Sequence, residues 1–128
     1  MLAIDTNIVV RCLVDDDHTQ SAQARALVSR EPVFVPITVV LEANWVLISG
    51  YGYDRASVCG ALRAFLGLPT VRIEDADRVA ECLDLVENGL DFADALHLVR
   101  SWRCSAFVSF DRRLLKSSSD RHVPLMEP

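Results

Sequence analysis

Short apolar segments alternate with longer segments of helical periodicity along this chain, and this alternation constrains the fold more than any other feature. The apolar segments predict strands at Leu2–Ile4, Val33–Val35, Thr70–Ile73, Ala106–Ser109 and, as a short fifth strand, Val123–Met126. The segments between them predict helices at Ile8–Val14, His18–Ser29, Val39–Ile48, Arg55–Leu66, Asp75–Val86 and Phe92–Trp102. Strands that alternate with helices form a mostly parallel sheet. We therefore expect an α/β three-layer sandwich, with helices on both faces of a four- to five-stranded sheet.

Size and composition predict one folded domain that spans residues 1–128. The 128 residues are 51% hydrophobic, enough for a full core, and 24% charged, close to the average of soluble domains. The cysteines are scattered without a metal-binding spacing and are predicted to be reduced core residues: Cys12, Cys59, Cys82 and Cys104. No segment reaches the roughly 20 apolar residues of a membrane span, and no export signal opens the chain. We expect a cytoplasmic protein.

Four carboxylates occur in apolar surroundings, where a negative charge is costly unless a cation compensates it. Asp5 and Asp111 each follow a predicted strand, Glu42 interrupts an apolar helix, and Asp94 lies one turn inside another. In open parallel sheets, ligands bind beyond the carboxyl ends of the strands. Mg²⁺ prefers oxygen ligands, and Mn²⁺ is a possible substitute. The pattern predicts metal-assisted phosphoryl transfer, with the choice between one and two ions left open.

The strand-end acids and Glu42 also have structural explanations. Asp5 and Asp111 suit a helix cap or an ordinary turn. Glu42 lies near a face that Val39 and Ala43 are predicted to bury, but a solvent-facing position is the alternative. The functional assignment of these acids therefore rests on the four taken together.

The acids at the start of the sixth predicted helix share one side of it, because Asp91 and Asp94 are three residues apart. A helix N-terminus favours negative charge, which explains both residues structurally. We assign Asp91 mainly to capping and Asp94 mainly to chemistry, because Asp94 lies among alanines and a leucine. His97, one turn further, is predicted to be structural or a substrate contact, since a hard cation prefers oxygen to imidazole.

The net charge of −5 counts against a general nucleic-acid coat protein. It does not exclude a nuclease, because a metal would neutralise several acids. A nuclease would need a local basic patch, and Arg112, Arg113 and Lys116 are the best candidates for substrate binding, with Arg11 and Arg103 weaker ones. The alternative for this cluster is a solvated helix face.

Four motifs occur in order along the chain: D-T-N at Asp5–Asn7, EANWVL from Glu42, D-A-L-H at Asp94–His97, and S-F-D at Ser109–Asp111. In this order the chain resembles the PIN-domain ribonucleases, and most closely the VapC-type toxins of bacterial toxin–antitoxin pairs. Serine at 109 is a departure, because threonine is commoner there, but the hydroxyl is kept.

The resemblance implies a PIN-like sandwich and a magnesium-dependent endoribonuclease. It implies that the metal-binding and catalytic acids are Asp5, Glu42, Asp94 and Asp111, with Asp91 accessory. It implies that Thr6, Asn7 and Ser109 order these ligands and the attacking water. It also implies an RNA substrate such as tRNA or rRNA, a cognate antitoxin, and a homodimer that forms a heterotetramer or a larger assembly with that antitoxin.

Other functions fit the sequence less well. A haloacid-dehalogenase-like phosphatase needs a second aspartate where this chain has Asn7, and a receiver-like domain needs one where the second predicted strand ends at Pro36. A non-catalytic PIN-like interaction module is the alternative of a different class, although such a module should have lost an acid. The Gly-Tyr-Gly-Tyr turn with Tyr51 and Tyr53 is predicted to contact a partner.

Overall fold

The structure, a computed structural model, describes residues 1–117 and 122–128. The chain divides into two compact units, Met1–Ala76 and Asp77–Pro128. Each unit has its own parallel strand pairing, so the two are described in turn.

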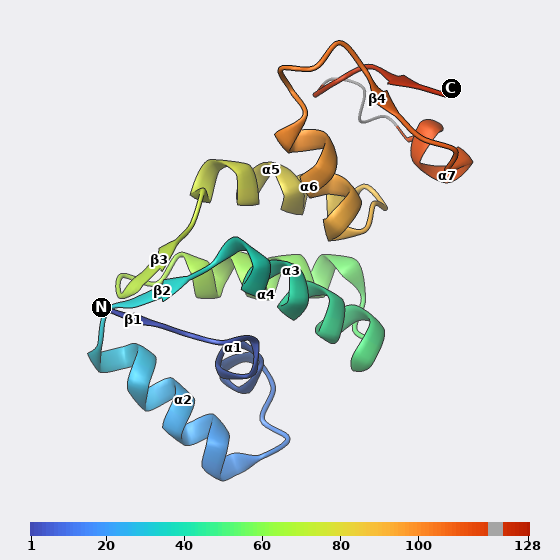
Figure 1. The fold of residues 1–128 in the computed structure, drawn as a ribbon. Helices are drawn as coiled ribbons and strands as arrows, with labels where there is room; N and C mark the ends of the chain where they lie inside the picture. The colour runs from blue at the N-terminus through green and yellow to red at the C-terminus, as the bar shows by residue number, and fades with distance from the viewer. Residues whose placement is uncertain (118–121) are drawn as a thin grey trace. The chain divides into compact units, whose positions relative to one another are not determined.

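A three-stranded parallel sheet is the centre of the first unit. β1 (Leu2–Ala3), β2 (Val33–Val35) and β3 (Val71–Ile73) pair in that order, side by side in Figure 1. Leu2 pairs with Val33, and Val33 pairs with Val71. Both valines of the central strand are fully buried. The predicted parallel pairing is confirmed here, and the three strands end at one edge of the sheet.

Four α-helices of the first unit surround this sheet, close to their predicted ranges. They are α1 (Thr6–Leu13), α2 (His18–Arg30), α3 (Ile37–Trp45) and α4 (Arg55–Leu66). α1 packs against both α2 and α3, whereas α4 packs against α3 and β3. Aspartates cap three of the four helices, and Asp54 accepts a hydrogen bond from the Ser57 N–H at 2.8 Å. Such caps satisfy backbone donors that the helix itself leaves unpaired.

α3 begins differently, because Pro36 at its N-cap position has no side chain that can accept a hydrogen bond. The missing acceptor comes from a distant residue. Oε2 of Glu74, just beyond β3, accepts a hydrogen bond from the Ile37 N–H at 2.8 Å. A carboxylate at this end of the helix also interacts favourably with the helix dipole. Glu74 therefore connects the end of β3 to the start of α3.

The predicted Val39–Ile48 helix changes from α-helical to π-helical winding at Val46. The π-helix η1 (Val46–Gly50) continues α3 and ends where the Tyr51 N–H donates to the Val46 carbonyl at 3.0 Å. Gly52 follows in the left-handed region, with φ of 77°, a conformation that glycine adopts without steric cost. The wider turn sets the direction in which the chain leaves the helix.

The second unit contains α5 (Ala76–Glu87), α6 (Phe92–Arg100), β4 (Phe107–Val108), α7 (Arg112–Leu115) and β5 (Leu125–Met126). β4 and β5 pair in parallel, with Phe107 opposite Leu125. The α/β class is confirmed, with strands paired as a set of three and a set of two. Helix α7 was not predicted, and α6 ends two residues before the predicted Trp102. The serine-rich sequence at Lys116–Asp120 predicts a surface turn, and this segment lies partly outside the described residues.

The burial of the cysteines differs from the prediction. Cys59 and Cys82 are buried, and burial raises the pKa of the Cys82 thiol to about 12. Cys104 is exposed and Cys12 is half-buried, so the prediction of a core position is wrong for Cys104. Among residues 1–117 and 122–128, none of the helices has the length and apolar character needed to cross a membrane.

The Glu74 cap yields a stability prediction. Replacing Glu74 with Ala should lower the free energy of unfolding by about 1 kcal/mol, the usual cost of losing an N-terminal cap. Glu74→Gln, which keeps an acceptor oxygen, should cost less. Urea unfolding measures both changes. Glu31→Ala, at an exposed glutamate beside β2, is the matched control and should change stability little. Equal stabilities of Glu74→Ala and the parent would contradict the cap.

Candidate functional site

Asp5 stands at the junction of β1 and α1. Its Oδ1 accepts a hydrogen bond from the Thr6 N–H at 2.7 Å, so the carboxylate contributes to the start of the helix. The side chain is nevertheless exposed. The Ile4 N–H donates to the Phe34 carbonyl at 3.0 Å, which carries the parallel pairing up to the residue before Asp5. Asp5 is therefore both a helix cap and an acid at the carboxyl edge of the sheet.

Two polar side chains close to the candidate acids in sequence are buried without a hydrogen-bond partner among the described residues. They are the Oγ1 of Thr6 and the Nδ2 of Asn44, in residues that are 7% and 3% exposed. Buried polar atoms are normally satisfied, and exceptions occur at functional sites. Thr6 was predicted to order the site. Asn44 was not, although an asparagine inside the apolar segment VVLEANWVL was a signal for it.

Glu42 lies on the solvent side of α3. Val39, Ala43 and Leu47 are buried as predicted, whereas Glu42 is exposed. Trp45, three residues later, is 65% exposed. The solvent-facing alternative for Glu42 is therefore the observed one, and burial gives no argument for its role. Its assignment as a metal ligand stays a prediction.

Glu74 is an acid at this edge that the sequence analysis missed. It follows β3 directly, as Asp5 follows β1, and β2 between them leads into α3. The sequence does contain a signal for Glu74. An acid that follows the apolar strand VRI repeats the pattern that singled out Asp5. Its hydrogen bond to the Ile37 N–H gives it a structural role.

The second unit brings three predicted acids together. Asp91, Asp94 and Asp111 line one small cavity of about 70 Å³, together with Arg113. Asp91 occupies the N-cap position of α6, but its side chain makes no capping hydrogen bond, so the prediction that its carboxylate caps the helix is wrong. Asp94 lies in the first turn of α6. The three acids thus line one cavity, and their assignment as metal ligands, with Asp91 accessory, stays a prediction.

The environment of Asp94 disfavours its charged form. Burial raises the pKa of the Asp94 carboxyl, and the negative charges of Asp91 and Asp111 raise it further. His97 and Arg113 act in the opposite direction without cancelling the effect. Carboxylates that share a site behave in this way when no cation separates them. The cavity therefore has the donor chemistry and the unfavourable charge that a hard divalent ion would relieve.

Asp111 also caps a helix. Its Oδ1 accepts hydrogen bonds from the N–H groups of Arg113 and Leu114, at 3.0 and 3.2 Å, and so starts the short helix α7. The Oγ of Ser109 accepts a hydrogen bond from the Asp111 N–H at 2.9 Å. The predicted ordering role of Ser109 thus has a physical basis in this turn.

The predicted basic cluster divides between two places. Arg113 lines the acidic cavity, where its charge opposes the rise in the pKa of Asp94. Arg112 and Lys116 line a different, shallow cavity. His97 stacks on Phe107 with ring centroids 6.3 Å apart. Of the three basic residues, Arg113 is the one that lines the cavity of the acids, and a role of any of the three in substrate binding stays a prediction.

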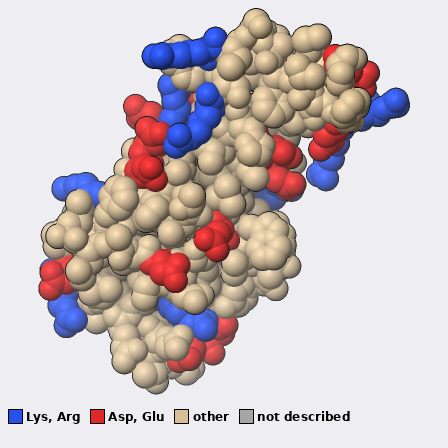
Figure 2. All heavy atoms as spheres, viewed as in Figure 1, with Lys and Arg blue, Asp and Glu red and all other residues tan. Residues whose placement is uncertain are grey.

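The predicted acids thus belong to different units. Asp5 and Glu42 lie in the first, and Asp94 and Asp111 in the second. Within residues 1–117 and 122–128, no three His, Cys, Asp or Glu side chains form a group that could hold a metal ion. Figure 2 shows acidic and basic side chains interspersed on the visible face, without one extended basic surface. Binding of Mg²⁺ or Mn²⁺, and the number of ions, stay predictions.

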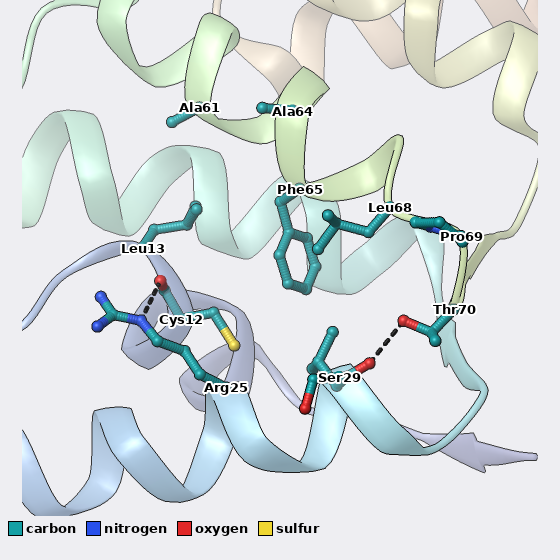
Figure 3. Close-up of a pocket in the computed structure, with 11 residues that line it drawn as sticks. Cys12, Leu13, Arg25, Ser29, Ala61, Ala64, Phe65, Leu68, Pro69 and Thr70 are labelled. Atoms are coloured by element: carbon teal, nitrogen blue, oxygen red, sulfur yellow. Dashed lines mark hydrogen bonds between the residues drawn. The ribbon is translucent and has the colours of Figure 1, made fainter.

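A larger cavity lies within the first unit. It has a volume of about 660 Å³ and is lined by residues of α1, α2, α4 and the segment before β3, including Cys12, Phe65 and Leu68 (Figure 3). Its walls are almost entirely apolar. Arg25 crosses one side and donates a hydrogen bond to the Cys12 carbonyl at 3.1 Å. None of the candidate acids lines it, so its size does not make it the site of hydrolysis.

Comparison with known proteins identifies the fold. The family model described as PIN domain matches residues 2–118, which covers the first unit from residue 2 and the second unit up to residue 118. This match confirms the predicted PIN-like α/β sandwich. PIN domains are generally nucleases, and they typically use divalent metal ions. A search of curated protein sequences gave no significant match.

The raised pKa of Asp94 predicts how stability depends on pH. Because the folded pKa lies above the unfolded value, the stabilising contribution is present below about pH 4 and is lost as pH rises through the folded pKa. Asp94→Asn should therefore raise the free energy of unfolding at neutral pH in EDTA, with the difference vanishing below about pH 4. Urea unfolding across pH measures this. Asp77→Asn, at an exposed acid of α5, is the control and should not stabilise. Destabilisation by Asp94→Asn at neutral pH would contradict the electrostatic account.

The unpaired hydroxyl of Thr6 predicts a stability gain on its removal. Thr6→Val keeps the shape of the side chain and removes a buried polar atom without a partner, so the free energy of unfolding should rise by about 1 kcal/mol. Thr38→Val, at an exposed threonine in the first turn of α3, should change it by less than about 0.5 kcal/mol. Thermal unfolding measures the change in stability for each of these two variants. A clear loss of stability in Thr6→Val would show that the hydroxyl is hydrogen-bonded in solution.

Proposed function

We propose, from the premise that this chain belongs to the PIN-domain family, that it is a metal-dependent endoribonuclease. The observation that carries the proposal is the convergence of Asp91, Asp94 and Asp111 on one cavity, where the pKa of Asp94 is raised. An acid whose pKa is shifted by burial and by neighbouring charges, and that lies in a cavity, is typical of a functional site. Family membership makes the reaction the hydrolysis of a phosphodiester bond.

In this proposal the carboxylates of Asp5, Glu42, Asp94 and Asp111 hold Mg²⁺, or Mn²⁺ in its place, with Asp91 accessory. The bound ion supplies polarisation of the phosphoryl oxygens and activation of a water molecule. A cation bound there would offset the negative charges of Asp91 and Asp111 that disfavour the ionised form of Asp94. The assignment of Asp5 and Glu42 to the same reaction rests on the order of the motifs along the chain.

The neighbouring polar residues have supporting roles. Ser109 orders the backbone that presents Asp111, through the hydrogen bond at 2.9 Å. Thr6 and Asn7, which follow Asp5 directly in the sequence, would order the surroundings of its carboxylate. Arg113 lies at the acidic cavity and offers a guanidinium to a phosphate oxygen of the substrate. Arg112 and Lys116 would contact the RNA chain farther from the cavity.

We further propose that the two units act as one domain over residues 1–128. The match of one family model across residues 2–118 supports this. The finer assignment, a VapC-type toxin that cleaves tRNA or rRNA in the cytoplasm, rests on the D-T-N, EANWVL, D-A-L-H and S-F-D motifs.

A toxin of this type acts with a cognate antitoxin and as a homodimer, or as a heterotetramer or larger assembly with the antitoxin. Exposed aromatic residues support protein contacts, because Trp45, Tyr51 and Tyr53 all reach the surface of the first unit. The assignment is tested by the product of a neighbouring short reading frame. That product should bind the protein and inhibit its cleavage of RNA.

One observation favours the second candidate, a non-catalytic PIN-like interaction module. Over the described ranges 1–117 and 122–128, no group of three metal-binding side chains stands ready to hold an ion. Against this candidate, all four of the acids are present in the sequence. An activity measurement separates the two.

The purified protein, free of antitoxin, should cleave RNA in a pool of total tRNA and ribosomal RNA with Mg²⁺ or Mn²⁺, and should not cleave it in EDTA. Asp94→Asn and Asp111→Asn should each lower the rate about a hundredfold or more, because each removes a charge from the site. The asparagine at 111 retains an oxygen that can cap α7. Gel mapping of end-labelled fragments gives the rates and the cut sites.

Asp77→Asn is the matched control, since this acid lies in α5 away from the acidic cavity. Its activity should equal that of the parent. Equal cleavage by Asp94→Asn would mean a contaminating nuclease or a wrong assignment of Asp94. A folded, antitoxin-free protein that cleaves nothing with either metal would favour the interaction module.

A further inference from the structure

A polar cleft lies between α1 and α2, and no function has yet been assigned to it. Its volume is about 380 Å³, within the usual range of small-molecule pockets. The polar side chains around it are those of Asn7, Arg11, Gln20 and Gln23. Ile8 and Leu27 give it apolar walls. The cleft combines aliphatic surface with three amides and one guanidinium.

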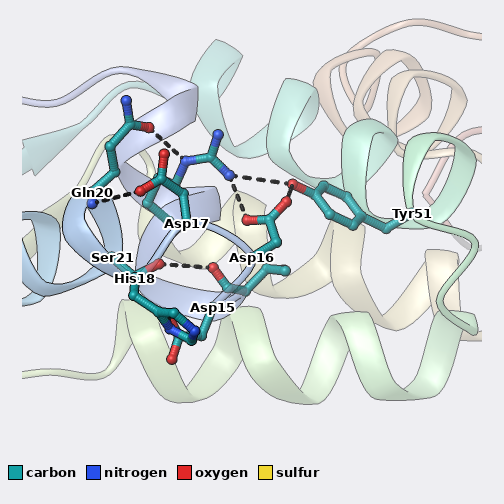
Figure 4. A network of polar contacts seen from close by, with 9 residues as sticks. Asp15, Asp16, Asp17, His18, Gln20, Ser21 and Tyr51 are labelled. Carbon is teal, nitrogen blue, oxygen red and sulfur yellow. Dashed lines mark hydrogen bonds and ion pairs between the residues drawn. The ribbon is translucent and has the colours of Figure 1, made fainter.

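A network of hydrogen bonds fixes the position of Arg11 in this cleft (Figure 4). Its Nη1 contacts Asp16, and its Nε donates to Oε1 of Gln20 at 2.8 Å. The Tyr51 hydroxyl donates to the other oxygen of Asp16 at 2.7 Å. This hydrogen bond lowers the pKa of Asp16, and Arg11 acts in the same direction. Because Asp16 offsets the charge of Arg11, the cleft is a poor site for a free anion.

The hydrogen bond from Nε of Arg11 also fixes the orientation of the Gln20 amide. The Nε–H of arginine can only donate, so the atom of Gln20 that it meets is the oxygen. The amide nitrogen of Gln20 therefore remains as a donor. The side-chain amides of Asn7 and Gln23 line the same cleft, and each can both donate and accept hydrogen bonds.

This combination of groups matches the edges and faces of a nucleobase. Asparagine, glutamine and arginine read base edges through paired hydrogen bonds. Unstacked bases of single-stranded RNA place their faces against protein side chains and their edges against polar groups. The cleft also adjoins the proposed site along the chain, because Asn7 lies two residues after Asp5 in the first turn of α1.

We propose that the cleft between α1 and α2 binds one base of single-stranded RNA beside the bond to be cut, and that it sets a base preference at that position. The inference rests on the proposed nuclease function for its biological meaning. The binding itself does not depend on catalysis. Gln23 is the most informative residue, because it is exposed and takes no part in the network that holds Arg11.

The first test measures binding without turnover. ¹⁵N-labelled protein in EDTA is titrated with each of the four ribonucleoside 5′-monophosphates, and the side-chain NH₂ signals of Asn7, Gln20 and Gln23 are followed. At least one mononucleotide should shift these signals, and Gln23→Ala should bind it about three- to tenfold more weakly, as expected for one lost hydrogen bond. Thr19→Ala, at an exposed position of α2 outside the cleft, should bind as the parent does.

Ribose 5-phosphate separates the base from the phosphate as the source of binding. It should leave the three amide signals unchanged. If ribose 5-phosphate shifts them as strongly as the mononucleotides do, the cleft is a phosphate site and the inference is overturned. If no mononucleotide shifts them at millimolar concentration, the inference is overturned as well.

The second test compares cut sites. The parent, Gln23→Ala and Thr19→Ala cleave the same RNA pool, and the sequences around the cuts are determined. Gln23→Ala should lose the base preference at one position next to the cut, whereas Thr19→Ala should keep it. An unchanged preference in a folded Gln23→Ala protein would overturn the inference. Mononucleotide binding at the cleft by a protein that cleaves no RNA would instead refute the nuclease proposal and leave the binding site standing.

Discussion

The parallel pairing of β1, β2 and β3 determines most of what the first unit can do. Parallel strands need a crossover between each pair, and their carboxyl ends therefore meet at one edge. Asp5 and Glu74 follow the two outer strands at that edge, and α3 with Glu42 follows the central one. The pairing thus explains how residues distant in sequence come to share one side of a sheet. It also gives Glu74 its position to hydrogen-bond the first turn of α3.

The acids of the chain combine two roles whose energetic requirements differ. Asp5 and Asp111 each use Oδ1 to start a helix, which stabilises the fold. Asp94 differs from them, because burial and the negative charges of Asp91 and Asp111 disfavour its ionised form. A carboxylate kept in such a place is typical of a functional site. In the first unit, the Oγ1 of Thr6 is likewise in an unfavourable place, because it is buried without a hydrogen-bond partner among the described residues.

Much of the fold followed from pattern, because hydrophobic periodicity depends on short-range sequence. Periodicity located α4 to the residue, and their apolar surroundings led us to group Asp94 with Asp111, two acids that line one cavity. The features that were missed depend on tertiary contacts. The hydrogen bond from Ile37 to Glu74 spans 37 residues, and no local pattern indicates it. Side-chain exposure also depends on tertiary contacts, which the local sequence does not show. For this reason Cys104 was wrongly predicted to lie in the core.

The π-helix at Val46–Gly50 has a consequence for the tolerance of this segment to changes in length. A π turn contains one residue more than an α-helical turn, and each residue of an α-helix rotates the chain by about 100°. Loss of a single residue here would restore regular winding and rotate Tyr51 away from Asp16, which it now contacts at 2.7 Å. Arg11 would then lose part of the network that holds it. A surface segment that ends in a glycine-rich loop would ordinarily accept deletions, but this one acts as a spacer of fixed length.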